Sequence, residues 1–133
     1  LPRGFSKDRI AEFYGRPGGQ AQELWPQSWQ TLLFNVARIA GTSKLVGVEE
    51  YGARNSWGVR LRTSTDGVHW SAPIDVPGVH SNEGWAKGNL HYPTFVNERG
   101  ASAHEIDPNG FYIVGSGAGG KITRYHVSLK MQP

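Results

Sequence analysis

The stretch Ser64-Thr65-Asp66-Gly67-Val68-His69-Trp70 decides how the rest of the sequence is interpreted. Asp-Gly is a turn signal, because glycine tolerates positive φ and the aspartate accepts hydrogen bonds from backbone N–H groups of its own turn. An ordinary hairpin needs only these two residues. Here a serine adds a second local hydrogen bond, and Trp70 returns on the next strand, where its ring can be buried between sheets. The stretch therefore predicts a clasp between two adjacent antiparallel strands.

The residues around this clasp are predicted to form a β-meander. Residues 57–64 alternate with a period of two, and residues 45–51 form an apolar strand before them. Residues 28–40 fit either a helix with a serine cap or a buried strand. We favour the strand, because the next segment of the chain is plainly β and the connection to it is only a turn long. Residues 69–73 are predicted to be the short fourth strand.

The second half of the chain repeats this plan, with the surplus length in a Gly-rich insertion at 75–89. Its three predicted strands cover residues 92–97, 111–114 and 122–129. Residues 1–31 read as an irregular or short-helical N-terminal segment. We therefore predict an all-β fold in which residues 32–133 form two antiparallel, four-stranded, blade-like sheets.

Composition supports this class and excludes others. Eighteen glycines, eight prolines and five tryptophans among 133 residues favour a turn-rich β protein, and the absence of cysteine excludes disulfides. The net charge is +3, but the basic residues are scattered, and strand alternation places Arg60 and Arg62 on one solvent face. This differs from the dense basic stripe of nucleic-acid binders. No apolar run approaches the ~20 residues that cross a membrane, and Leu1-Pro2-Arg3-Gly4 lacks the apolar core of a signal peptide.

The clasp resembles a motif of a known family. The Asp box of sialidases and related β-propellers reads Ser-x-Asp-x-Gly-x-x-Trp or a form that is one residue shorter, and Ser64, Asp66, Gly67 and Trp70 match the shorter form. The Ser-Ala-Pro after the clasp is also typical of that family. In such propellers these boxes lie on the outer side, away from the central funnel. The resemblance therefore implies a structural role for the four residues.

Two further stretches extend the resemblance over roughly residues 32–129. Residues 89–95 look like the opening of an inner blade strand in sialidase-like and five-bladed glycosidase propellers. Residues 111–129 resemble the end of a last blade. The resemblance implies a partial β-propeller that is secreted and carbohydrate-active. Because propellers have four or more blades, it also implies completion by the rest of a longer chain or by a homo-oligomer.

Four carboxylates are the candidate catalytic groups, because glycoside hydrolysis needs an acid and a base or nucleophile. Glu49 and Glu50 are neighbours on a strand and point to opposite faces, so one can face a site while the other is solvated. Glu105 and Asp107 are two residues apart and can share a face, where like charges raise one pKa. The alternative is that all four are turn or surface carboxylates.

The candidate substrate-binding residues derive from the resemblance. It implies that His91 and Tyr92, at the rim of an inner strand, face the funnel, and that Arg54 contacts substrate. Trp57 or Trp85 would suit stacking on sugar faces. The alternative is that the histidine caps a loop and the tyrosine packs. The Arg-Ile-Pro signature of sialidases is absent, and spacing does not identify an arginine triad.

No metal or cofactor is expected. The five histidines show no tight ligand spacing. Residues 115–120 fit G-x-G-x-x-G literally, but phosphate binding needs a helix after the loop, and an alternating strand stands there instead.

Three functions remain open from the sequence. The first is a glycoside hydrolase, sialidase-like or related, or a fragment of one. The alternative is a non-catalytic, lectin-like module that binds a glycan or oligosaccharide on the same scaffold. A basic secreted nuclease or toxin domain using histidine and glutamate is the third.

Overall fold

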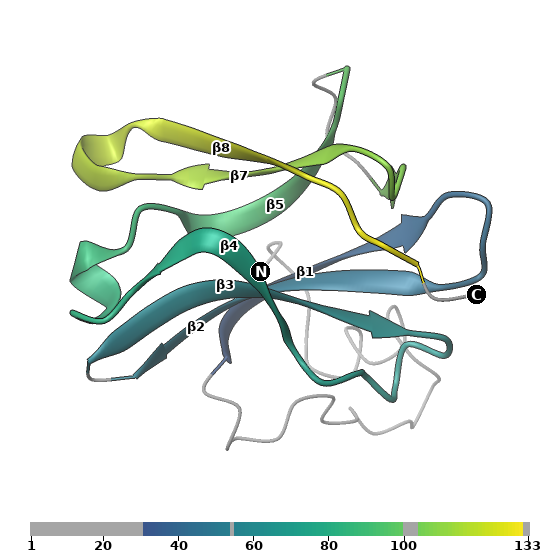
Figure 1. The fold of residues 1–133 in the computed structure, drawn as a ribbon, viewed down its shortest axis with the longest axis horizontal. Coiled ribbons are helices and arrows are strands. Elements are labelled where there is room, and N and C mark those ends of the chain that lie inside the picture. Colours follow the sequence, from purple (N-terminus) through teal and green to yellow (C-terminus); the bar gives the residue numbers. More distant parts are fainter. Residues whose placement is uncertain (1–30, 54, 100–103, 132–133) are drawn as a thin grey trace, which may run out of the picture.

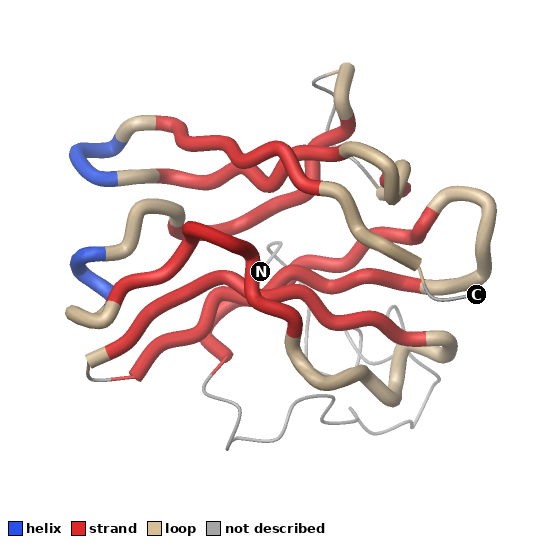
Figure 2. The backbone as a smooth tube through the Cα atoms, in the orientation of Figure 1, coloured by secondary structure: helices blue, strands red, loops and turns tan. Residues whose placement is uncertain are grey.

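The computed structural model describes residues 31–53, 55–99 and 104–131, and these fold as an all-β structure of curled sheets resembling a half-barrel (Figures 1 and 2). Its strands are β1 (Thr31–Ile39), β2 (Leu45–Ala53), β3 (Ser56–Ser64), β4 (Ile74–Ser81), β5 (His91–Asn97), β6 (Glu105–Ile106), β7 (Phe111–Ser116) and β8 (Ile122–Val127). The 3₁₀ turn η2 (Trp85–Lys87) lies between β4 and β5, and η3 (Ala118–Gly120) lies between β7 and β8. The prediction of a strand rather than a helix is confirmed for residues 31–39. Residues 1–30 of the predicted N-terminal segment lie outside the described residues.

The first sheet has the order β4-β3-β2-β1-β6. Its first four strands form the predicted antiparallel meander, in which each strand pairs with the next along the chain. The short β6 then pairs parallel to β1 through Arg38↔Glu105 and Ile39↔Ile106. The connection from β5 to β7 therefore returns to the first sheet.

The second sheet, with the order β5-β7-β8, lies above the first (Figure 1). Both pairs are antiparallel, and β5 packs against β1 and β2 of the first sheet. The loop over residues 115–120 leads into strand β8 rather than a helix, as the sequence predicted. No helix within the described ranges combines the length and apolar character needed to span a membrane.

The core fills the space between the two sheets. On β2 and β3 the inward residues alternate as the pleat requires, and Val48 and Leu61 pair across the strands. On the second sheet Phe95 and Phe111 meet edge to face with their ring centroids 5.8 Å apart. All four side chains are buried, so one continuous apolar layer holds the sheets together.

The fourth strand differs from the prediction. Residues 69–73 contain no strand, and β4 instead occupies 74–81, which overlaps the predicted insertion at 75–89. Pro77 and Gly78 made this segment look like a turn. Gly78 has φ 80°, and the pairing with β3 shifts register, so the strand bends. An edge strand tolerates the proline. The sheets have five and three strands instead of the predicted four each, because the short β6 joins the first sheet beside β1.

The 64–70 clasp connects β3 to β4 and is held by side-chain hydrogen bonds. Ser64 Oγ accepts from the backbone N–H groups of Asp66 (3.2 Å) and Gly67 (2.8 Å). Asp66 Oδ1 accepts from the N–H groups of Val68 and His69, both at 2.8 Å. Gly67 has φ 77°, the left-handed conformation that the predicted turn requires. Trp70 is half-buried and lies in the connection ahead of β4 rather than on a strand.

We predict that Ser64→Ala lowers the free energy of unfolding by about 1 kcal/mol, because two backbone N–H groups of the turn lose the acceptor that the buried serine supplies. Urea denaturation measures this change. Thr65→Ala is the control, since Thr65 is an exposed neighbour in the same turn with no side-chain hydrogen bond to a described residue. Equal stability of the two variants would contradict the role of the serine.

Asp66 makes the stability of the clasp depend on pH. Its hydrogen bond with the His69 side chain, and then those with the His69 and Val68 N–H groups, hold the pKa of Asp66 far below its usual range. A depressed pKa in the folded state stabilises the fold above the unfolded carboxyl pKa of about 4 and loses this effect as the pH falls further.

The difference in melting temperature between the wild type and Asp66→Ala is therefore expected to be constant from pH 7 to about 5 and to shrink below pH 4. Differential scanning calorimetry across this range measures it. For Thr65→Ala we expect a difference that does not change with pH. A difference for Asp66→Ala that grows on acidification would refute the assignment.

Candidate functional site

Glu50 lies on β2 with its carboxylate fully buried on the face toward the second sheet. Its Oε2 accepts from Trp57 Nε1 at 2.6 Å and lies 2.6 Å from His91 Nδ1. Its Oε1 accepts from the backbone N–H of Tyr92 at 2.9 Å. An ionised carboxylate only accepts, so the contact with Nδ1 matches an imidazole that donates from this nitrogen. One buried acid therefore joins three of the predicted site residues, two of them from the other sheet.

Aromatic rings enclose His91 on two sides. Trp57 meets it edge-on with centroids 5.3 Å apart, and Trp85 lies tilted over it at 4.1 Å. Gly88 allows this approach, because a Cβ there would lie 2.6 Å from the Trp57 ring and 2.7 Å from His91 Cε1. Gly88 is not among the predicted site residues, although two glycines flank the 3₁₀ turn that carries Trp85.

Tyr92 has an unusual backbone for a large residue. Its φ is 57°, in the left-handed region that aromatic side chains rarely adopt, and the pairing of β5 with β7 shifts register beside it. Such strain persists where the surroundings hold it, and Glu50 binds this N–H. The side chain points outward and the residue is 60% exposed, while Trp85 is 43% exposed. We call these two residues the aromatic rim.

Glu49 is also fully buried, on the opposite face of β2, which corrects the expectation that one of the two acids is solvated. Its Oε1 lies 3.1 Å from both Arg62 Nε and Arg60 Nε. Arg62 is 3% exposed and also donates to Ser71 O, so the predicted solvent face for these arginines was wrong. Buried acids with such partners hold strands together and have no surface to offer a substrate.

The other two predicted acids lie elsewhere. Glu105 is exposed and accepts from Arg38 Nε and Nη2 at 2.9 and 2.6 Å. Asp107 accepts from the Asn109 N–H at 2.9 Å and caps its own turn. Glu50 and Glu105 pair with β1 at positions 33 and 38, which are about 16 Å apart at the rise of a strand. Catalytic carboxylates of glycosidases lie only about 5–9.5 Å apart.

The other residues considered for substrate binding are buried, lie outside the described residues or make separate contacts. Trp57 is fully buried and has no surface for stacking on a sugar. Arg54 lies outside the described residues. Arg38 and Arg124 make separate contacts, the first with Glu105 and the second over the Tyr112 ring, so they do not form a cluster. In the described part of the chain, no group of three or more acidic or histidine side chains is arranged to hold a metal ion.

Comparison of this chain with models of known protein families, with curated proteins and with solved structures finds no match in any of the three. The candidate site therefore rests on its own geometry. That geometry is a buried Glu50–His91 pair beneath the aromatic rim, at the beginning of β5.

We predict that Glu50→Gln lowers the free energy of unfolding by about 2–3 kcal/mol. The amide keeps one acceptor atom in place of two. Its nitrogen therefore faces either the Tyr92 N–H or the donors of Trp57 and His91, and the N–H groups on that side lose their acceptor. Urea denaturation measures the loss. Glu105→Gln is the matched control, because its exposed ion pair with Arg38 contributes less than about 1 kcal/mol. If both variants lose equally little, the carboxylate does not anchor the site.

Proposed function

We propose that this chain contributes two neighbouring blades to a secreted β-propeller. The β1–β4 meander supports this, because it is a four-stranded antiparallel unit with the clasp between its third and fourth strands. The sheet of β5, β7 and β8 comes next along the chain and packs on its face. Strands from a longer chain or from a second copy would cover the remaining sheet edges, as closed propellers require.

Within this scaffold we propose that the protein binds a glycan at the aromatic rim. The observation that carries the proposal is the fixed exposure of Trp85 and Tyr92 above the buried Glu50–His91 pair. A flat aromatic face matches the C–H face of a sugar ring, and side chains that are already ordered lose little entropy on binding. The carboxylate orders both sides of the rim, through the imidazole under one ring and the backbone N–H of the other.

The burial and the partners of the four candidate acids favour glycan binding without hydrolysis. Glu49 and Glu50 are enclosed with their partners, Glu105 is paired with Arg38, and Asp107 caps a turn. None of the four lies at the rim beside a second carboxylate. A lectin-like module needs no such pair.

Glycoside hydrolysis is the second candidate, favoured by the 2.6 Å contact between Glu50 and His91. A buried carboxylate that orients an imidazole is a common arrangement for a general base. A hydrolase would need a further acid from residues outside the described ranges. Turnover of chromogenic glycosides that disappears in Glu50→Gln would favour this candidate over the module.

We predict that Trp85→Ala and Tyr92→Gly each weaken glycan binding at least about tenfold, as expected for the loss of an exposed aromatic anchor. Glycine at position 92 removes the ring and accepts the positive φ, so the backbone is not strained further. A printed array of neutral, uronic and sialylated oligosaccharides identifies a ligand, and calorimetry then measures its affinity.

Ile122→Ala is the control for this experiment, because Ile122 is an exposed apolar residue at the start of β8, on the other sheet edge. Its substitution is expected to leave glycan affinity unchanged. The proposal fails if the array shows no binding to the wild-type protein, or if the rim variants bind as tightly as the control.

A further inference from the structure

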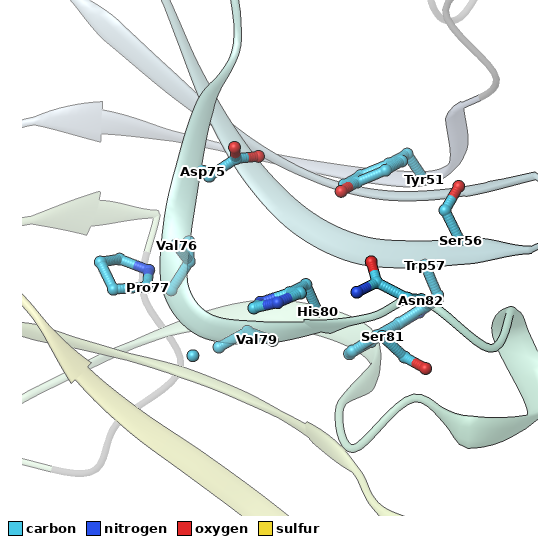
Figure 3. Close-up of a pocket in the computed structure, with 11 residues that line it drawn as sticks. Tyr51, Ser56, Trp57, Asp75, Val76, Pro77, Val79, His80, Ser81 and Asn82 are labelled. Carbon is cyan, nitrogen blue, oxygen red and sulfur yellow. The ribbon is translucent and has the colours of Figure 1, made fainter.

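A second concave site lies at the β4 edge of the first sheet. It is a cavity of about 310 Å³, an open pocket bordered by the bend of β4 and the adjoining ends of β2 and β3 (Figure 3). Tyr51, which is next to Glu50 on β2 and so points to the opposite face, forms one wall. Trp57 also borders the cavity, and its indole N–H donates to Glu50. The cavity therefore lies next to the candidate site but is not part of it.

Three polar side chains converge on this cavity, two from β4 and one from the residue that follows it. Figure 3 shows Asp75, His80 and Asn82 on the inner side of the bend, with Pro77 on its outer side. All three are exposed, and none of their side chains makes a hydrogen bond or ion pair with another residue of the described ranges. A carboxylate, an imidazole and an amide are thus left to bind a ligand.

The wall formed by Tyr51 is held in place. The guanidinium carbon of Arg60 lies 3.7 Å from the centre of its ring. The ring also lies across Gly58, where a Cβ would come within 2.6 Å of its Cε1 and hydroxyl oxygen. The glycine therefore permits an aromatic wall that a larger residue would displace.

We infer that this cavity binds a single neutral sugar ring. Its volume lies at the lower end of the roughly 300–1,000 Å³ of small-molecule sites, so it accommodates one ring rather than a chain. A carboxylate accepts from two hydroxyl groups, and an amide both donates and accepts, which matches adjacent hydroxyls of a sugar. Asp75 is the acidic side chain among the lining residues, and its charge disfavours an acidic ligand. This inference rests on the groups of the cavity and does not require binding at the aromatic rim.

The test is titration of the isotope-labelled full chain with the methyl glycosides of glucose, galactose and mannose, followed by the amide NMR signals. At least one glycoside is expected to shift the signals of Tyr51 and of the non-proline residues in the range 75–82. Glucuronic acid is the acidic probe and is expected to bind at least about threefold more weakly than the corresponding neutral glycoside. The inference is wrong if no glycoside shifts these signals, or if glucuronic acid binds as tightly as the neutral sugar.

Substitutions then assign the contacts. We expect Asp75→Ala to weaken binding of the glycoside about tenfold and Asn82→Ala about threefold, as for charged and neutral hydrogen bonds. Glu83→Ala is the matched control, since Glu83 is an exposed acid beside the cavity and does not line it. Unchanged affinity in Asp75→Ala would overturn the inference.

A final variant separates this site from the proposed glycan surface. Trp85→Ala is expected to weaken binding at the aromatic rim at least about tenfold and to leave the shifts of residues 75–82 intact. Loss of the shifts in this variant would mean that the cavity is not a separate site. Cavity binding that persists while the rim binds no glycan would overturn the proposed function alone.

Discussion

The position of the two sheets depends on the buried carboxylate of Glu50. Removing an ionised acid from water costs several kcal/mol, and only well-placed donors offset that cost. Glu50 has three, one from its own sheet and two from the beginning of β5. Apolar packing between the sheets tolerates sliding, because it is not directional. The three hydrogen bonds do not tolerate it, so they set where β5 lies on β2.

On β2, the surroundings of two neighbouring acids depend on how the strand pairs with β3. β2 is the central strand of five, and both of its faces are covered at positions 49 and 50. Sequence alternation correctly predicted that these acids point to opposite faces. It could not predict that Glu49 meets Arg60 directly across the ladder, with Arg62 two positions along, since that depends on the register of β2 with β3. Without the register, two arginines at alternate positions look like a solvent face.

Most strands of the described chain could be predicted from the sequence, because their apolar residues alternate regularly. The exceptions are the two-residue β6 and β4, and the pattern of β4 is interrupted by Pro77 and Gly78 at the bend. These residues signal a turn in most contexts, but at a sheet edge they produce a bulged strand. The bend that concealed the strand from sequence analysis also borders the cavity. Its polar lining could not be predicted either, because Asp75 and Asn82 come together only through this curvature.

The candidate site shows a different limit. The sequence indicated Glu50, Trp57, His91 and Tyr92 individually, as a catalytic acid and as groups that contact substrate. In the structure the acid and two of the rings are buried, and they support the residues that remain exposed. Residue type indicates that a position is chemically capable, whereas burial decides whether it meets a ligand or holds another side chain that does. The strained φ of Tyr92 is a consequence of this division, because the buried acid holds the backbone in a conformation that directs the ring outward.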